Sequence, residues 1–386
     1  MKRVSGARAA AAVTAAAGVA ALTGYAVFGA SGAAPRTGPA VVRAGLEHPP
    51  HAFVRADGLF EGSGKRTQLA APVSGAMIGP LAPVAVRSPD GSLVAYNTWR
   101  ELRATDDRSF SAQRVADGDA LGVPSLRIHA DRRDVLLGRG AYSAAWRDDG
   151  AIAFVKASDP VFRAGRAYDG EIVVLPGLQG RGVAWTSDPA HYVVYSWAGK
   201  RLLFYRVGLG EKLELLVADA PRAVRPLADG SAIAVSPDGA RVAVVGQDGT
   251  NVRVLDIATG RELAWLDVTT TTPALRWVAY SGSWTGSHVV APANAGVAVF
   301  DVGADSLELE QVLSLDQAEF PVGVQAPRFG DGTGNEIVAV ADIPPGRGSE
   351  GMSFFLDCNR ITRECERGDA APAKDWLRPV DEGGDR

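Results

Sequence analysis

The sequence predicts an all-β protein built from repeated small antiparallel sheets. The clearest copy is the segment 231–267, which holds four short runs rich in Val, Ile and Leu, at 231–235, 241–246, 251–256 and 262–267. The turns between these runs carry Pro-Asp-Gly, Asp-Gly and Thr-Gly, about ten residues apart. Proline pre-sets φ, aspartate bonds its own backbone and glycine accepts a positive φ. Runs this short between such turns are typical of strands joined by hairpins.

The second run of this segment is apolar on both of its faces. Val242 and Val244 point to one face, and the residue after each of them points to the other. A half-solvated strand would alternate, so we expect sheets stacked on both sides of this one. Six copies of the pattern recur about 40 to 60 residues apart, which is the period of four-stranded blades. We therefore expect a single β-propeller of six four-stranded antiparallel blades, or of seven if residues 38–83 form a blade of their own.

Each repeat is expected to begin with its innermost strand, followed by a turn signal and further strands. Innermost strands are expected at 84–86, 141–146, 183–185, 231–235, 275–278 and 326–329. The turn signals after them are expected at 88–91, 148–150, 187–189, 237–239, 281–287 and 330–332. The strands that complete the repeats are expected at 93–97, 125–129, 134–137, 152–155, 171–175, 192–195, 201–205, 213–217, 241–246, 251–256, 262–267, 288–291, 296–301, 308–315, 336–341, 352–357 and 364–368.

The residues of the clearest copy also carry a resemblance to a known family. The segment reads SPDG, then RVAVV, then VLDIATGRE. This pattern resembles the repeat of TolB-type, WD-repeat-like bacterial β-propellers, and the resemblance covers roughly residues 81–368. It implies a non-enzymatic protein-binding or scaffold module with a protein partner in the cell envelope. The alternatives are a propeller hydrolase or lyase with a site at the channel mouth, and a ligand-sensing ectodomain.

The N-terminal segment predicts export from the cytoplasm. Basic residues at Lys2, Arg3 and Arg8 precede an uncharged run at 9–30, and small residues then lead to Pro35. This layout is typical of a secretory signal, although the run is also long enough for an uncleaved membrane anchor. The protein is therefore expected outside the cytoplasm, secreted or anchored. We expect a signal peptide or anchor at 1–34, a linker with strands that can close the ring at 35–80, the propeller at 81–369 and a flexible tail at 370–386.

The two cysteines, Cys358 and Cys365, predict a disulfide. Aligned with the clearest copy, they occupy facing positions across the last hairpin of a blade, within reach of one another. An even number of cysteines in such register, in an exported protein, is typical of a bridge. A metal site at these cysteines would need two further ligands, and no histidine lies near them in the sequence.

The sequence does not predict a catalytic, metal-binding or ligand-binding site from any other group of residues. The histidines 48, 51, 129, 191 and 288 are scattered, and Asp331, Asn335 and Glu336 lack the spacing of a calcium loop. The tryptophans 146, 185, 197, 265, 277 and 284 are expected to pack between blades, and a sugar-binding platform is the less favoured interpretation. The net charge is −4 and the sequence has no stripe of basic residues, so it does not predict binding to nucleic acid. We expect no catalytic, metal-binding or cofactor-binding residue and no enzyme, and the only membrane contact expected is the N-terminal segment if it stays uncleaved.

Overall fold

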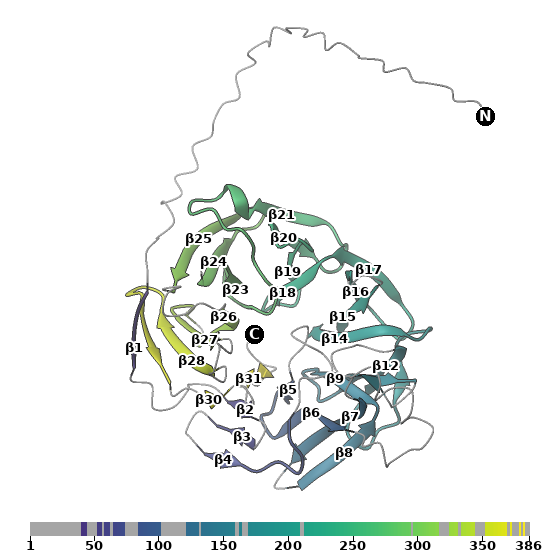
Figure 1. Cartoon of the computed structure of the whole chain (residues 1–386). Coiled ribbons are helices and arrows are strands. Elements are labelled where there is room, and N and C mark those ends of the chain that lie inside the picture. Colours follow the sequence, from purple (N-terminus) through teal and green to yellow (C-terminus); the bar gives the residue numbers. More distant parts are fainter. Residues whose placement is uncertain are drawn as a thin grey trace, which may run out of the picture. The chain divides into compact units, whose positions relative to one another are not determined.

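A computed structural model describes the greater part of the chain after residue 39 (Figure 1). All described residues lie in the second of two compact units, Pro35–Arg386. The predicted signal segment at 1–34 and nearly all of the polar stretch at 101–119 lie outside them. The described ranges are 40–44, 52–55, 58–61, 65–73, 84–101, 121–130, 133–158, 162–163, 169–208, 212–294, 296–315, 324–330, 333–343, 352–368, 371–372, 378–379 and 381–382.

The segment predicted as the clearest repeat forms one four-stranded antiparallel sheet in the order β18-β19-β20-β21. Its strands are β18 (Ser231–Val235), β19 (Arg241–Val245), β20 (Asn251–Asp256) and β21 (Glu262–Asp267). At the first turn, Asp238 accepts hydrogen bonds from the Ser236 hydroxyl and from the Ala240 amide at 3.0 Å, and Gly239 takes a φ of 66°. A short 3-10 helix, η3 (Val268–Thr270), follows the sheet. The turn chemistry therefore closes the hairpins where the sequence predicts them.

Two neighbouring four-stranded groups follow the same strand order. The first consists of β14 (Ala190–Ala198), β15 (Arg201–Val207), β16 (Leu213–Ala218) and β17 (Val224–Asp229). The second consists of β9 (Ala141–Trp146), β10 (Ile152–Ala157), β12 (Asp169–Leu175) and β13 (Val183–Ala184). The pairs Asp169↔His191 and Gly170↔Ala190 join these groups into one eight-stranded sheet.

The remaining sheets include strands from both ends of the described chain. One sheet holds β22 (Ser283–Thr285), β23 (His288–Ala293), β24 (Gly296–Val302) and β25 (Leu307–Ser314). The next sheet holds β26 (Val324–Phe329), β27 (Glu336–Ile343), β28 (Met352–Asn359) and β29 (Glu364–Arg367). Two further strands join it: β1 (Val41–Ala44) pairs in parallel with β29, and β30 (Ala371–Pro372) pairs with β28.

Another sheet holds β5 (Ala85–Arg87), β6 (Leu93–Glu101), β7 (Leu121–Ala130) and β8 (Arg133–Arg139). In this sheet β32 (Asp381–Glu382) pairs with β5, and β11 (Phe162–Arg163) pairs with β7. The last holds β2 (Phe53–Arg55), β3 (Gly58–Phe60), β4 (Arg66–Thr67) and β31 (Arg378–Pro379), in the order β31-β2-β3-β4.

Two segments predicted as the innermost strands of their sheets do not begin those sheets in the structure. The run at 183–185 contributes only β13, which pairs with β12, while β14 begins the next group. The run at 275–278 forms only an isolated bridge, between Val278 and Ala293, and β22 takes the place beside β23. In the second case the hairpin turn lies at Gly286, whose φ is 52°. A positive φ suits glycine, so the turn at Gly286 is tighter than the predicted turn at 281–287, and residues 283–285 of that range form β22.

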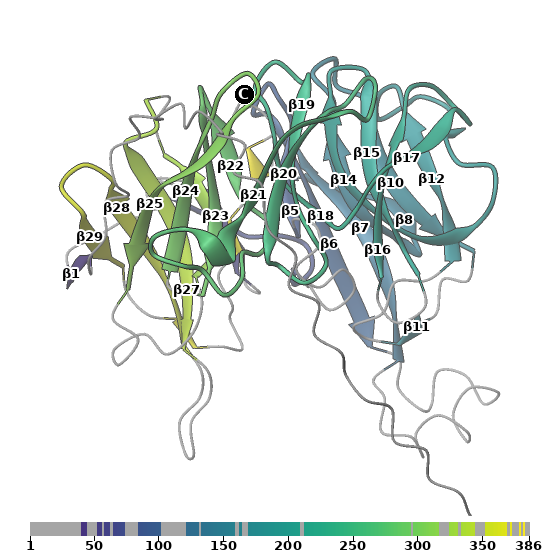
Figure 2. The ribbon, with the colours of Figure 1, turned by 90° about the horizontal axis from the view of Figure 1, so that it is seen from above.

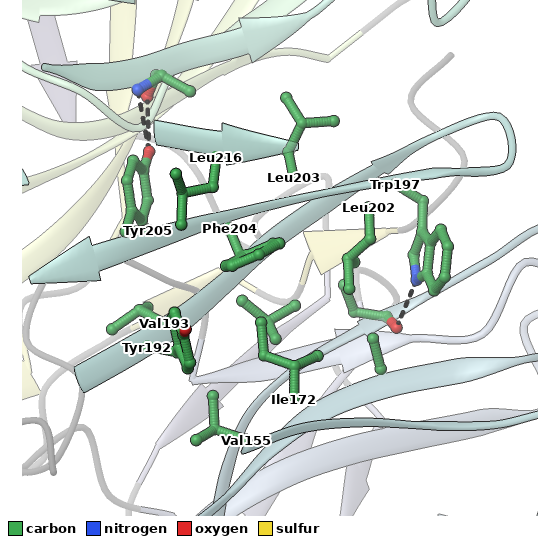
Figure 3. Packing of buried hydrophobic residues seen from close by; sticks show 14 of the residues in the cluster. Val155, Ile172, Tyr192, Val193, Trp197, Leu202, Leu203, Phe204, Tyr205 and Leu216 are labelled. Atoms are coloured by element: carbon green, nitrogen blue, oxygen red, sulfur yellow. Dashed lines mark hydrogen bonds between the residues drawn. The ribbon is translucent and has the colours of Figure 1, made fainter. Parts of the chain in front are cut away.

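Apolar side chains fill the spaces between successive sheets. Figure 2 shows the sheets standing side by side, and Figure 3 shows the core around Phe204. The rings of Tyr192 and Phe204 meet edge to face at 5.4 Å, and both Phe204 and Leu216 are buried. In β19, Val242 and Val244 belong to one buried cluster and Ala243 and Val245 to another, so both faces of this strand are buried, as its sequence predicted.

Aromatic hydrogen bonds also join one sheet to the next. Trp146 Nε1 donates to the Val86 carbonyl at 3.3 Å, and Trp197 Nε1 donates to the Ala145 carbonyl at 3.1 Å. The Tyr205 hydroxyl accepts the Ala232 amide at 2.9 Å (Figure 3). These buried polar tips satisfy backbone groups of a neighbouring sheet, so they fix the sheets relative to one another as well as filling space.

The first and last sheets of the described chain also touch. Phe53 of β2 stacks on Phe60 of β3 and meets the ring of Phe355 in β28 edge to face, each at 4.9 Å. Val338 and Val340 of β27 belong to the same buried cluster. Among the residues that the structure describes, no helix has the length and apolar character needed to cross a membrane.

Candidate functional site

The candidate site is a groove on the sheet β18–β21. It has a volume of about 440 Å³ and is lined by Gly246, Asn251, Arg253, Glu262 and Trp265. We call this set of residues the β20–β21 groove. It is open to solvent and combines one aromatic ring with a carboxylate, a guanidinium and an amide, so its lining is mostly polar.

Strand register brings these side chains to one face of the sheet. Arg253 of β20 lies directly opposite Trp265 of β21, and Asn251 lies two residues before Arg253. Side chains two residues apart share a face, and cross-strand partners lie about 5 Å apart at Cβ. The intervening Val252 and Val254 are buried on the other face. The groove therefore occupies the polar face of a sheet whose opposite face belongs to the core.

Gly246 leaves room for the amide of Asn251. A Cβ placed on Gly246 would lie 2.6 Å from Asn251 Nδ2 and 2.9 Å from Asn251 Oδ1. The Gly246 amide also donates to the Asn251 carbonyl at 3.0 Å, which fixes the two residues beside each other. A side chain at this position would displace the Asn251 amide from the groove.

Two arginines connect this sheet with the strand β17 of its neighbour. Arg253 Nη2 donates to the Asp229 carbonyl at 2.6 Å. In the other direction, Arg225 Nη2 donates to the carbonyls of Ile257 at 2.5 Å and Ala258 at 2.8 Å. Each sheet thus supplies an arginine that binds backbone oxygens of the other, and this reciprocal pair holds the wall of the groove in place.

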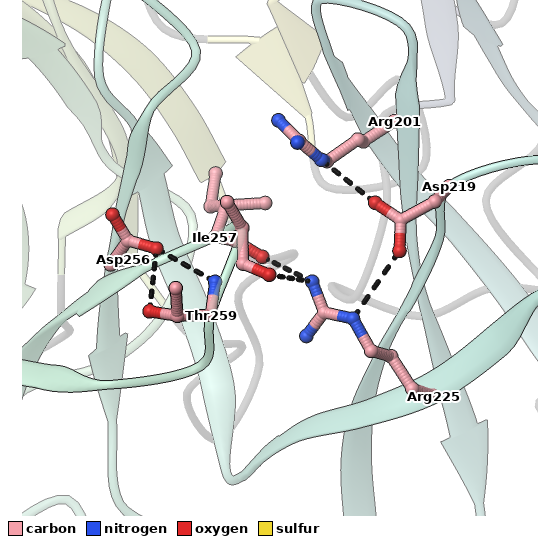
Figure 4. A network of polar contacts seen from close by, with 7 residues as sticks. Arg201, Asp219, Arg225, Asp256, Ile257 and Thr259 are labelled. Atoms are coloured by element: carbon pink, nitrogen blue, oxygen red, sulfur yellow. Dashed lines mark hydrogen bonds and ion pairs between the residues drawn. The ribbon is translucent and has the colours of Figure 1, made fainter.

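Arg225 is itself positioned by an ion-pair network. Figure 4 shows Asp219 between two arginines, with Arg201 Nε at 2.8 Å and Arg225 Nε at 3.3 Å from its carboxylate oxygens. Asp256, at the end of β20, accepts the Thr259 amide and hydroxyl, each at 2.7 Å. Carboxylates and hydroxyls therefore order the turn that receives Arg225.

The tryptophans divide into two groups. Trp146, Trp185, Trp197 and Trp284 are buried, as the sequence predicted. Trp265 and Trp277 are not, with 55% and 38% of their surface exposed. For Trp265 the expectation of packing between sheets is therefore wrong. The sequence did hold a signal for this, because Trp265 alternates with the apolar Ala264 and pairs with the polar face of β20.

A second polar cluster lies on the last sheet, on β27 to β29. Asp357 of β28 lies opposite Glu366 of β29, and Glu336 of β27 lies opposite Asn359, two residues further along β28. Burial, together with the charges of Glu336 and Glu366 and a hydrogen bond with Glu336, raises the pKa of Asp357 to about 6. Among the described residues, no group of three or more His, Cys, Asp or Glu side chains is arranged to hold a metal ion. Asp331, which the sequence analysis grouped with Asn335 and Glu336, lies outside these residues.

The described histidines lie apart from one another. Each pairs with one carboxylate: His129 with Asp134 at 3.4 Å, His191 with Asp169 at 3.4 Å and His288 with Glu310 at 3.2 Å. His48 and His51 lie outside the described residues. No two of these three histidines share one of these carboxylates.

The aspartates of the repeat turns accept hydrogen bonds from residues of the same turn. Ser88 and Ser92 bond Asp90, Arg147 bonds Asp149, and Ser236 bonds Asp238. These hydrogen bonds lower the pKa values of all three carboxyls. They are structural groups of the hairpins, as the turn pattern predicts.

The predicted disulfide is present between Cys358 and Cys365. These residues are cross-strand partners in β28 and β29, with Cα atoms 4.0 Å apart. Both cysteines are buried. The strand β1 pairs with β29 on the side away from β28, and its Val42 lies opposite Cys365. A disulfide in this position is typical of a protein from an oxidising compartment.

Among the comparisons with known proteins, only the one with solved structures found similar proteins. No family model matches the chain, and no curated protein matches it. Similar structures include prolyl endopeptidases, at 14% identity and a TM-score of 0.50, covering 86% of this chain and 46% of theirs. They also include the Pyrococcus horikoshii acylaminoacyl peptidase (10% identity, TM-score 0.41, 77% of this chain and 45% of that chain) and the β-propeller domain of Myceliophteria thermophila Cps50 (11%, 0.46, 80% and 91%).

The repeated four-stranded antiparallel sheets support a β-propeller. This chain spans less than half the length of the two peptidases to which it is similar. The expectation that the protein is not an enzyme is corrected, because a prolyl endopeptidase, which is an enzyme, has a similar structure. Identities of 14% and below show the fold and leave the reaction to be proposed.

Proposed function

We propose that this protein is an exported β-propeller of hydrolytic function that binds its substrate in the β20–β21 groove. The observation that carries the proposal is the groove itself, in which an exposed indole adjoins a carboxylate, a guanidinium and an amide. The likeness to prolyl endopeptidases supports the hydrolytic class. The resemblance of the repeat to TolB-type propellers supports a place in the cell envelope.

The groove is built for binding and orientation. The Arg253 guanidinium is held by the Asp229 carbonyl, and the backbone of Asn251 is bonded to that of Gly246, so one polar side chain of the groove is ordered before a substrate arrives. Preorganised groups lose little entropy on binding, which favours affinity. Trp265 offers a large apolar surface on the same face. We assign binding and positioning to these residues and leave the reacting group unassigned.

We further propose seven blades. The eight-stranded sheet counts as two, and β2, β3 and β4 form a blade that the C-terminal strand β31 completes. Contact between Phe53 and Phe355 supports closure between this blade and the last one. The disulfide supports the proposed position outside the cytoplasm, either secreted or anchored by residues 1–34, where a protein partner of the envelope is also expected.

The test is hydrolysis by the purified full chain against panels of peptide, ester, lactone and glycoside substrates. We expect turnover of one panel, with Trp265→Ala raising KM by about tenfold or more because the indole binds substrate. Trp277→Ala, which removes an exposed tryptophan outside the groove, is the matched control and should leave KM unchanged. Absence of turnover in every panel, or equal KM values for both variants, would refute the proposal.

A further inference from the structure

The chemistry of the β20–β21 groove identifies a class of ligand. We infer that this groove binds a saccharide, presented as a chain of sugar units. The inference rests on the proposed function in naming the substrate class for the same groove, but binding is measured independently of hydrolysis. It is carried by three features of the groove: the exposed ring, the polar groups around it and the balance of charge.

The exposed ring is the first feature. Trp265 keeps 55% of its surface exposed while its neighbours Ala264 and Leu266 are buried or half-buried. The ring lies on the same sheet face as Arg253, its cross-strand partner, in the wall of a concave site. A sugar ring has a flat face of C–H groups bordered by hydroxyls. Such a face can cover an indole while the hydroxyls reach polar groups at its border.

The polar groups are the second feature. Glu262 offers acceptors, Arg253 offers donors and Asn251 offers both. Vicinal hydroxyls each donate and accept, so one sugar unit can pair with all three planar side chains. Arg253 is already held in place by the Asp229 carbonyl at 2.6 Å, and the absence of a side chain at Gly246 leaves room for the Asn251 amide. The groove therefore presents one positioned guanidinium and two further polar side chains beside a stacking surface.

The balance of charge is the third feature. One guanidinium and one carboxylate line the groove, so its formal charge is balanced. A nucleic acid would require several cations along a backbone path. An extended peptide binds by adding a strand to a sheet edge, here that of β21, and its main chain would pair there without covering the sheet face that carries Arg253 and Trp265. A neutral saccharide fits these observations better than either polymer.

The experiment is calorimetric titration of the full chain with neutral hexasaccharides of different linkage: chitohexaose, cellohexaose, laminarihexaose and maltohexaose. We expect at least one to bind with a Kd of about 1 mM or tighter. Trp265→Ala should weaken that binding by about tenfold or more, because the stacking surface is lost. Gly246→Ala should weaken it several-fold by displacing the Asn251 amide, and Trp277→Ala should have no effect.

Intrinsic fluorescence gives a second readout. The bound hexasaccharide should shift tryptophan emission in the wild type and in Trp277→Phe, and the shift should be lost in Trp265→Phe. Saccharide binding without turnover would uphold this inference and refute the hydrolytic function. No binding of any hexasaccharide, binding that Trp265→Ala leaves intact, or binding only of an extended decapeptide would overturn the inference.

Discussion

At the scale of single residues, Asp357 gives a pH-dependent test. Its pKa is raised from 3.8 to about 6, chiefly by burial and then by the charges of Glu336 and Glu366. The folded state therefore holds the proton more tightly than the unfolded state. The resulting stabilisation is complete below about pH 4 and is lost as the pH rises through about 6.

We expect Asp357→Asn to stabilise the protein above pH 6, because the amide carries no charge to bury. The full shift corresponds to about 3 kcal/mol, and partial exposure of this carboxyl reduces the expected gain to about 1 to 2 kcal/mol. Urea unfolding at pH 4 and pH 8 measures the difference. The exposed Asp305→Asn is the control, and a gain of equal size at both pH values would contradict the raised pKa.

At the scale of strands, the disulfide between β28 and β29 fixes the outer hairpin of the last sheet. It closes a short loop, and the chain-entropy model for such a loop gives a stabilisation of about 2.5 kcal/mol. We expect the double variant Cys358→Ser, Cys365→Ser to unfold at a temperature lower by about 5 °C. Differential scanning calorimetry with and without reductant measures it. If the double variant melted with the wild type, the bridge would contribute no stability.

How far the sequence predicts these strands depends on how strongly each turn is encoded. Around residues 237–239 proline, aspartate and glycine all favour one turn, and the strands on either side agree with prediction. Around residues 281–287 the turn residues are weak, so the position of β22 depends on Gly286 and on packing against β23. The sequence analysis did not predict the groove, because the exact register between β20 and β21 places Trp265 opposite Arg253, and the residue pattern did not fix that register.

At the scale of the whole described unit, strands from the ends of the chain join sheets formed elsewhere. β31 pairs with β2, and β1 pairs with β29. A sheet completed by a distant strand has its otherwise open edge protected by backbone hydrogen bonds. The sequence analysis expected ring-closing strands at 35–80, where β1 and β2 lie, but a flexible tail at 370–386, where β31 lies. It did not predict the partners of these strands, because neither segment carries the repeat pattern.

Removal of the two C-terminal strands, β31 and β32, tests this pairing. We expect deletion of residues 373–386 to lower the melting temperature and to promote association through the freed edge of β2. Calorimetry and light scattering measure these effects. Deletion of residues 383–386 alone spares β31 and β32 and should change neither quantity. Unchanged melting in the longer deletion would contradict closure by β31.

Hydrogen–deuterium exchange locates the bound saccharide on the molecule. Exchange of the full chain is followed with and without the hexasaccharide that binds most tightly. We expect slower exchange across residues 246–267, with little change in the other sheets. Protection confined to a different sheet, or no protection while the saccharide is bound, would contradict this expectation.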